Sequence, residues 1–138
     1  MKGEIVQLKV RCKNFPVIGG HKLSPERIYQ IAKESDTINT LLKNGSFVGE
    51  DYRQFLKERE SYMGEQSIIR VCQVNLLNAT HKILSFKMDN GELVAKVRLL
   101  KDNVVIKELI PRIVFKSDLS HLNVITFDAE CSDRKSVV

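Results

Sequence analysis

The clearest hydrophobic pattern in the chain is a pair of alternating segments on either side of Asn90-Gly91. This dipeptide favours a two-residue type I′ turn, which needs a positive φ at both central residues. The apolar cross-strand pairs predicted by this turn are Met88 with Leu93, Phe86 with Ala95, and Leu84 with Val97. The opposite face then carries Ser85, Lys87, Val94, Lys96 and Arg98. A shift of one residue would move the apolar set into water, so turn and pattern predict the same register.

Before this hairpin, the pattern predicts one strand followed by helices. Residues 4–12 alternate with a period of two, and their apolar side carries Val6, Leu8, Val10 and Cys12. Ser24-Pro25 is typical of a helix start, because serine accepts from first-turn amides and proline suits the first helical position. A second short helix begins at Ser35 or Asp36 and ends at Asn44-Gly45, and a third spans residues 51–63.

From Ser67 onward the period changes to two, which predicts strands. We expect them at 68–77, in the hairpin at 82–100, and at 104–110, 113–115 and 122–129. Pro111 cannot donate to a strand ladder, so it predicts an edge position or a bend. The expected fold is α+β, with a mostly antiparallel sheet or a partly closed β-barrel and a two- to three-helix insert between the first strand and the rest. Residues 1–130 are expected to form a single domain, with residues 131–138 as a flexible C-terminal tail.

The composition is that of an ordinary globular chain. Its 138 residues are 43% hydrophobic and 28% charged, which suits one domain with its own core. No apolar run approaches the ~18 residues of a membrane span, and the N-terminus lacks a signal-peptide core. We therefore expect a soluble intracellular protein without membrane contact. The three cysteines lie far apart without a CxxC pair, so neither a disulfide framework nor a zinc site is expected.

Candidate catalytic residues are few. The histidines are His21, His81 and His121, and each is expected to be a surface or loop residue rather than a catalytic base. Thr80-His81 and Ser120-His121 are not nucleophile–base pairs, because adjacent strand residues point to opposite faces. The sequence has no metal-ligand spacing, Walker loop or GxGxxG, so no metal or other cofactor is expected. Glu50-Asp51 precedes a predicted helix and is interpreted as a helix cap.

The net charge of +5 and the pI near 9.2 are compatible with an acidic partner. The candidate binding residues are Lys9, Arg11, Lys87, Lys96, Arg98 and Arg112, and the first five line one predicted sheet face. Sheets that bind single-stranded nucleic acid usually add stacking aromatics. The chain has six Phe, three Tyr and no Trp, and most of these fall at inward positions. A solvated basic face is therefore favoured over a nucleic-acid interface.

Four segments, 14–35, 38–50, 71–100 and 110–130, together resemble the prohead (head-maturation) proteases of tailed phages. Gly49-Glu50 matches a glycine–glutamate motif of that family, and Thr80-His81 stands at its Ser-His position. Arg112 matches the arginine of a Ser-x-Arg segment, and Phe127-Asp128 matches the Phe-Asp end of the following strand. The resemblance implies a phage origin, with the host cytoplasm or the virion as location.

The same comparison predicts that the protease chemistry is lost. Ile110 stands where Ser-x-Arg places its serine, and an isoleucine has no nucleophilic atom. The leading hypothesis is therefore a non-catalytic protein-binding domain, either a capsid or assembly component or an inhibitor of a phage or host protein. One alternative is an active serine endopeptidase that uses His81 with Ser117 or Ser120. A second alternative is a basic nucleic-acid-binding module; a homo-oligomer and a small nucleotide ligand stay open.

Overall fold

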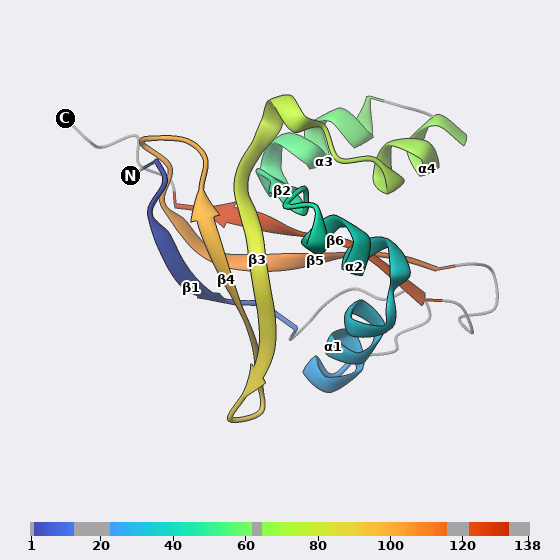
Figure 1. Cartoon of the computed structure of the whole chain (residues 1–138). Helices are drawn as coiled ribbons and strands as arrows, with labels where there is room; N and C mark the ends of the chain where they lie inside the picture. Colours follow the sequence, from blue (N-terminus) through green and yellow to red (C-terminus); the bar gives the residue numbers. More distant parts are fainter. Residues whose placement is uncertain (1, 13–22, 62–64, 116–121, 133–138) are drawn as a thin grey trace.

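The computed structural model describes residues 2–12, 23–61, 65–115 and 122–132 (Figure 1). The chain forms helices and antiparallel sheets, which confirms the α+β fold class. In order, the elements are β1 (Ile5–Lys9), α1 (Pro25–Glu34), α2 (Asp36–Lys43), β2 (Val48–Glu50), α3 (Tyr52–Glu60), α4 (Glu65–Cys72), the 3-10 turn η1 (Leu76–Asn78), β3 (Ala79–Asp89), β4 (Glu92–Leu99), β5 (Ile106–Phe115) and β6 (Leu122–Cys131). No helix in the described part of the chain is long and apolar enough to cross a membrane.

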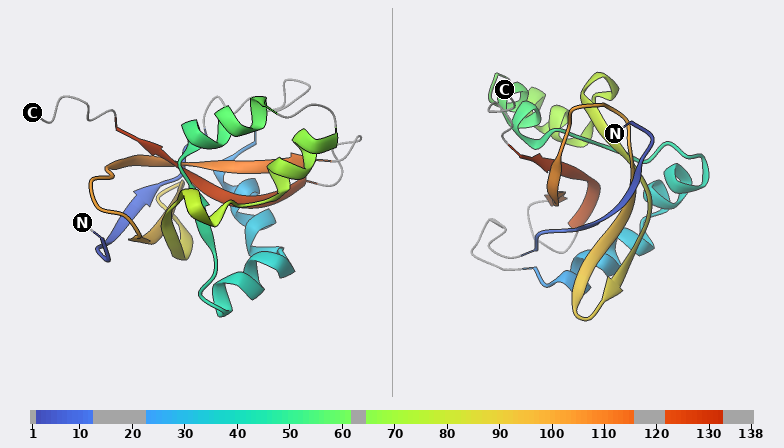
Figure 2. Two further views of the ribbon diagram at one scale, coloured as in Figure 1. Left: turned by 90° about the horizontal axis from the view of Figure 1, so that it is seen from above. Right: turned by 90° about the vertical axis from the view of Figure 1, so that its left-hand side faces the viewer.

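The strands form two sheets, one with the order β1-β4-β3-β2 and one that pairs β5 with β6. The two sheets meet edge to edge at two isolated parallel bridges, Val10 with Leu109 and Asp51 with Ala129. No closed barrel forms. Figures 1 and 2 show α1 and α2 on one side of the β5–β6 sheet and α3 and α4 on the other.

The central hairpin has the predicted turn and most of the predicted register. Asn90 and Gly91 have φ values of 51° and 80°, as a type I′ turn requires. Met88 pairs with Leu93 and Phe86 with Ala95. The third predicted pair is wrong, because an irregularity between Ile83 and Ser85 places Ile83, not Leu84, opposite Val97. Ile83 is consequently the residue that joins the core.

The helix starts follow the predicted local chemistry. The Ser24 side chain accepts from the Arg27 amide at 3.1 Å, and Ser35 does the same for α2. Asp51 caps α3 by accepting from the Arg53 amide at 3.0 Å. Such caps stabilise a helix by about 1 kcal/mol each, and they depend only on residues close in sequence. The predicted end of the third helix at Met63-Gly64 lies outside the described residues.

The predicted strand at 68–77 is wrong. Its first part belongs to helix α4, and its end belongs to the short turn η1. Three polar residues interrupt the alternation of this segment. The Arg70 side chain binds the buried carboxylate of Glu50, the Gln73 carbonyl accepts from Arg70, and the Asn75 amide donates to Glu50. The tertiary partner of Arg70 therefore prevails over a weak local strand preference.

Pro111 does not interrupt β5, which runs through it from Ile106 to Phe115 and joins the two short strands predicted there. Pro111 lies opposite Phe127 in the ladder with β6. The edge position predicted for this proline is confirmed, because β5 pairs along its length with β6 only. Its other edge meets β1 at the single Val10–Leu109 bridge.

The core lies between the two sheets and α1. Fully buried apolar side chains from both sheets and from α1 meet there, including Val10, Ile28, Phe47, Leu93, Leu109 and Phe127. The Phe127 ring contacts Phe86 edge-on at a centroid distance of 5.7 Å and Phe47 at 6.1 Å. This packing holds β6 against β2 and β3, and so positions the polar residues described next.

Candidate functional site

A buried ionic cluster joins the two sheets to α4. It contains Glu50 of β2, Arg70 of α4, Arg112 of β5 and Asp128 of β6, and none of the four is more than 6% exposed. Arg112 binds Asp128 through two bonds, Nε to Oδ2 at 2.9 Å and Nη2 to Oδ1 at 2.8 Å. Its Nη2 also donates to Glu50 Oε2 at 2.9 Å. Arg70 completes the cluster by donating from Nη2 to Glu50 Oε1 at 2.7 Å.

Groups around this cluster complete its hydrogen bonds. The centroid of the Phe55 ring in α3 lies 3.8 Å from Cζ of Arg112 and 5.2 Å from Cζ of Arg70, so the ring faces both guanidinium groups. The Gln73 carbonyl accepts from both arginines, at 2.8 Å and 2.7 Å. In the described part of the chain, no buried side-chain nitrogen or oxygen lacks a hydrogen-bond partner. The buried polar atoms of the cluster are therefore all hydrogen-bonded within the protein.

The carboxylates of the cluster respond differently to their surroundings. Burial alone would raise the pKa of Glu50, but hydrogen bonds from Arg70, Arg112 and the Asn75 amide outweigh it and lower that pKa. Burial raises the pKa of Asp128, and the Arg112 guanidinium opposes that shift. Glu50 thus accepts four hydrogen bonds from three residues as a carboxylate.

His81, the candidate base, lies in β3 next to the cluster and is completely buried. Its Nε2 lies 2.8 Å from the Phe127 carbonyl oxygen, which only accepts, so Nε2 carries the proton. Nδ1 then accepts from the Thr80 hydroxyl at 2.8 Å. Burial lowers the pKa of His81 to about 4, against the Phe127 carbonyl that raises it. Both ring nitrogens are engaged in a neutral ring that no solvent reaches.

Gly49 makes this arrangement of His81 possible. A Cβ atom on Gly49 would lie 2.1 Å from the Phe127 carbonyl oxygen and 2.5 Å from His81 Nε2. Only glycine leaves room at this position for the ring and the neighbouring β6 backbone to approach β2. The bond from His81 to Phe127 therefore depends on the residue opposite His81 in the β2–β3 ladder.

Several sequence predictions about this region need correction. Thr80 and His81 do meet, through Oγ1 and Nδ1, although both side chains were expected on opposite faces. Glu50 does not cap α3; Asp51 alone does so, and Glu50 accepts from two arginines instead. Arg112 is buried and is not part of a binding surface. Ser117 and Ser120, the candidate nucleophiles, lie outside the described residues.

The residues that carry the resemblance to prohead proteases converge in space. Gly49 and Phe127 enclose the His81 ring, and Glu50, Arg112 and Asp128 form the ionic cluster beside it. Ile110, at the position of the family's serine, is 5% exposed and lies opposite Asp128 in the β5–β6 ladder. Motifs separated by up to 79 positions in the sequence thus occupy one region of the fold.

The members missed by the sequence analysis left a signal that could have found them. Arg70, Arg112 and Asp128 are each a single charge inside an otherwise apolar run: SIIRVC, LIPRIVF and VITFDA. A lone charge in a segment that is buried for other reasons needs an opposite charge nearby. Two arginines and one aspartate of this kind predict a buried pairing, although not which partner each one takes.

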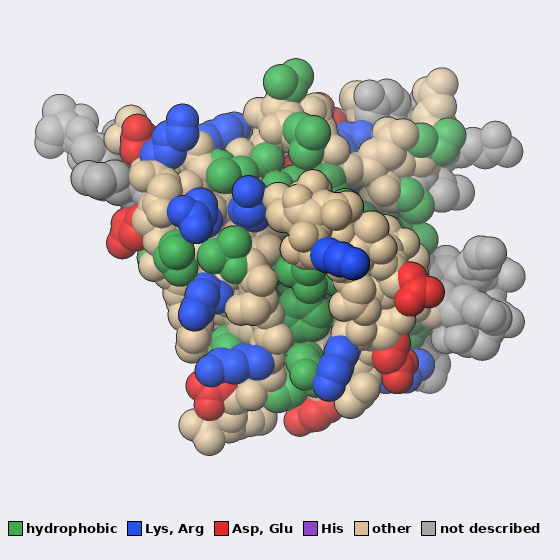
Figure 3. Space-filling view, viewed as in Figure 1, with side chains coloured by type: hydrophobic (Ala, Val, Ile, Leu, Met, Phe, Trp, Pro, Cys, Tyr) green, Lys and Arg blue, Asp and Glu red, His purple; other side chains and the backbone are tan. Residues whose placement is uncertain are grey.

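The predicted basic face forms on β1, β4 and β3, with a different membership. Lys87, Lys96 and Arg98 are exposed and lie in neighbouring rows of the sheet. Lys9 lies in the same surface but pairs with Glu92 at 3.4 Å, and Arg11 pairs with Glu108 and Glu130. Figure 3 shows Lys and Arg side chains over this side of the molecule. The outward positions of these three strands carry no aromatic ring among the described residues.

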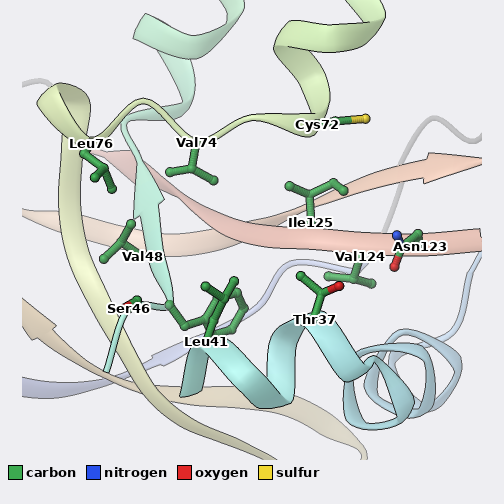
Figure 4. Close-up of a pocket in the computed structure, with 11 residues that line it drawn as sticks. Thr37, Leu41, Ser46, Val48, Cys72, Val74, Leu76, Asn123, Val124 and Ile125 are labelled. Atoms are coloured by element: carbon green, nitrogen blue, oxygen red, sulfur yellow. The ribbon is translucent and has the colours of Figure 1, made fainter. Parts of the chain in front are cut away.

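An apolar groove, the α2–β6 groove, lies beside the β2–β6 junction, where the Asp51–Ala129 bridge joins the two strands (Figure 4). It lies on the α2 side of this junction, whereas the ionic cluster lies on the side of α3 and α4. It encloses about 380 Å³ between α2, β2, β6 and the segment from Cys72 to Leu76. Its apolar lining consists of Leu41, Phe47, Val48, Val74, Leu76, Val124 and Ile125.

Exposed apolar side chains lie in and near this groove. Leu76 in η1 lines it and is 71% exposed. Leu77 in η1 is 85% exposed and Ile69 in α4 is 53% exposed, and neither of them lines the groove. Single exposed apolar residues are ordinary on a protein surface, but one that lines an apolar recess is typical of a contact site. The sequence analysis missed this surface, because it assigned residues 68–77 to a strand.

Comparisons with known proteins add no assignment to this geometry. Among the described residues, no group of three or more His, Cys, Asp or Glu is placed to hold a metal ion. No family model, no curated protein and no solved structure matches this chain.

Proposed function

We propose that this protein is a non-catalytic protein-binding domain on a prohead-protease-like scaffold. In this proposal it is a phage-encoded assembly component, or an inhibitor of a phage or host protein. The observation that carries the binding function is the α2–β6 groove, an apolar recess of about 380 Å³ whose lining includes the exposed Leu76. A partner that covers these side chains removes apolar area from water, which is favourable by roughly 25 cal/mol per Å².

The non-catalytic part of the proposal is supported by His81. A general base must reach the proton that it abstracts, either directly or through one water. Both nitrogens of His81 are already hydrogen-bonded, and its ring is 0% exposed. Ile110, beside Asp128, supplies no nucleophile at the position that the resemblance indicates.

The scaffold part is supported by the convergence of the resembling motifs. Residues from β2, β3, β5 and β6 form one enclosed cluster, although the chain separates them widely. In the proposed history, such a cluster keeps the scaffold rigid after the chemistry has gone. The binding surface then lies elsewhere, on the apolar side of the same strands.

The proposal is tested by capture with matched surface variants. Immobilised wild-type chain is exposed to lysate of the source phage and its host, and retained proteins are identified by mass spectrometry. We expect one defined protein that Leu76→Asp loses and Ile5→Asp keeps, because Ile5 is a 49%-exposed apolar residue on a different surface. The proposal is contradicted if Leu76→Asp retains the same protein as the wild-type chain, or if the wild-type chain retains no protein above background.

A second candidate function, binding of a nucleic-acid backbone, is favoured by the basic face of β1, β4 and β3. Lys87, Lys96 and Arg98 supply charges without aromatic rings, which suits phosphate contacts rather than base stacking. Fluorescence polarisation with labelled single- and double-stranded DNA, titrated with salt, tests it. The candidate predicts a steep loss of affinity with salt and a shallower slope for Lys96→Gln. A salt-independent signal, or none at low salt, contradicts it.

A further inference from the structure

We propose that the α2–β6 groove binds an extended segment of its partner as an added strand along the free edge of β6. The inference rests on the proposed protein-binding function and specifies how the partner is held. It needs three features: an unpaired strand edge inside the groove, walls that admit one strand, and a lining that selects its side chains.

The first feature is the edge of β6. One edge of this strand pairs with β5, and the other meets β2 at the Asp51–Ala129 bridge. Next to that bridge, Thr126 reaches β2 through its side chain, with Oγ1 donating to the Val48 carbonyl at 2.6 Å. The remaining stretch, residues 122–125, has no strand beside it on this edge within the described part of the chain.

That free stretch borders the groove with its backbone. Three consecutive residues, Asn123, Val124 and Ile125, line the groove. Successive strand side chains point to opposite faces, so three in a row border one space only where the strand presents its edge. Figure 4 shows Ile125 and Val124 directed to opposite sides of β6, which agrees with an edge-on view of the strand. An incoming strand can therefore pair with backbone groups of β6.

The walls distinguish a single segment from a second copy of this chain. Leu41 of α2 stands on one side of the edge, and Val74 and Leu76 stand on the other (Figure 4). A groove of about 380 Å³ with walls on both sides suits one extended segment better than the β6 edge of a second folded copy. A single extended segment is thin enough to enter, since neighbouring strands lie only about 4.8 Å apart.

The lining defines the chemistry of the segment. Leu41, Val74 and Leu76 are apolar, and Thr37, Ser46 and Asn123 supply the polar part of the lining. Among the described residues, no lysine, arginine or carboxylate lines the groove, so this lining does not favour a charged polymer. The occupant is accordingly a peptide strand with apolar side chains at alternate positions, which enter the groove while the residues between them face solvent.

The test uses a random octapeptide display library selected on the full chain. We expect selected sequences with apolar residues at alternating positions. The best peptide is then synthesised with a fluorophore, and its affinity is measured by fluorescence polarisation. Leu76→Asp should weaken binding at least tenfold, whereas Leu77→Asp should stay within twofold. The two leucines are adjacent and exposed, but only Leu76 lines the α2–β6 groove. Equal effects of the two variants overturn the assignment of the site.

A second measurement separates strand addition from simple apolar contact. Each amide of the peptide is N-methylated in turn, which removes one backbone donor without changing the side chains. Strand pairing predicts at least a tenfold loss at alternate positions, because only every second residue directs its N–H toward the neighbouring strand. Uniform tolerance of methylation overturns strand addition. If the captured protein still depends on Leu76, the proposed binding function survives that result; if no capture occurs, the binding function itself fails.

Discussion

The two sides of the β2–β6 junction carry opposite kinds of side chain: charged residues that are buried on one side, and apolar residues that line an open groove on the other. On the side of α3 and α4, Glu50, Arg70, Arg112 and Asp128 are almost completely enclosed and bind one another. On the side of α2, the groove is apolar and open, and Leu76 at its rim is 71% exposed. The charged residues are thus paired with one another inside the protein, and apolar residues of a kind usually found in the core line a groove at the surface.

This contrast changes where function is sought. A buried charge network attracts attention as a catalytic site, because active sites also hold charged residues with shifted pKa values. Here every buried side-chain nitrogen and oxygen in the described residues has a partner, and the network joins β2, β5, β6 and α4. An open apolar recess without charge attracts less attention, although covering it with a partner removes apolar surface from water and lowers the free energy.

The largest expected loss of stability comes from a substitution in the ionic cluster. Arg112→Met removes the one residue in the described part of the chain whose side chain binds both Glu50 and Asp128, and it leaves two buried carboxylates with fewer donors. We expect a loss of about 3–5 kcal/mol in the free energy of unfolding. Urea denaturation followed by circular dichroism measures it.

The matched control for this prediction is Arg98→Met, which removes an exposed arginine from β4. Its effect should stay within about 0.5 kcal/mol. Equal losses for the two variants would mean that the cluster contributes nothing specific, and the structural role given to it would be wrong.

The next effect is a pH dependence that originates at His81. Its pKa is about 4 in the folded protein and near 6.5 when exposed, because burial disfavours the charged ring. Between these values the unfolded chain binds the proton and the folded protein does not. Stability is therefore complete above pH 6.5 and falls as the pH drops toward 4, by up to about 3 kcal/mol.

Denaturation midpoints from pH 7.5 to 4 measure this dependence. In His81→Gln the decline over the same interval should be clearly smaller, whatever the absolute stability of the variant. A wild-type protein as stable at pH 4.5 as at pH 7 would contradict the buried neutral imidazole.

A steric test sharpens the assignment of Gly49. Gly49→Ala places a methyl group 2.1 Å from the Phe127 carbonyl oxygen, so β2 and β6 must separate. We expect a destabilisation of about 2–3 kcal/mol, at the upper end for overpacking. In the double variant with His81→Ala, the loss caused by the alanine should shrink only in part, because the backbone carbonyl remains. Full recovery in that double-mutant cycle would place the whole clash on the imidazole ring.

The smallest expected effect lies on the apolar side. Leu76→Asp and Leu77→Asp change exposed side chains, so each should alter the free energy of unfolding of the isolated chain by no more than about 0.5 kcal/mol. Thermal denaturation checks this. A large loss for Leu76→Asp would mean that the groove contributes to the core, and the contrast between the two sides of the junction would then disappear.

Much of the fold was predictable from the sequence. The Asn90-Gly91 turn, the pairs Met88–Leu93 and Phe86–Ala95, and the caps at Ser24, Ser35 and Asp51 were all expected. Helix α4 was not expected, because residues 68–77 contain enough apolar residues to suggest alternation. The irregularity at Leu84 was missed as well, since no turn signal marks an extra residue within a strand.

The candidate sites were much less predictable. The lone charges at Arg70, Arg112 and Asp128 were visible, but their partners lie 16 to 62 positions away in the chain. The groove was invisible, because the segment that forms one of its walls was assigned to a strand. Of the five residues predicted for the basic face, Lys87, Lys96 and Arg98 are exposed on one face, whereas Lys9 and Arg11 pair with acidic residues. Arg112, a further candidate binding residue, is buried.

The sequence by itself determined the features that depend on residues a few positions apart. A turn, a cap or an alternating strand has its energy in contacts between neighbours, so its signal is local. Only the tertiary structure decided which charges pair, whether His81 can reach a substrate, and which apolar residues stay exposed. Those outcomes depend on which elements pack against each other, and burial sets the energy of a charge or an apolar side chain only after that packing is complete.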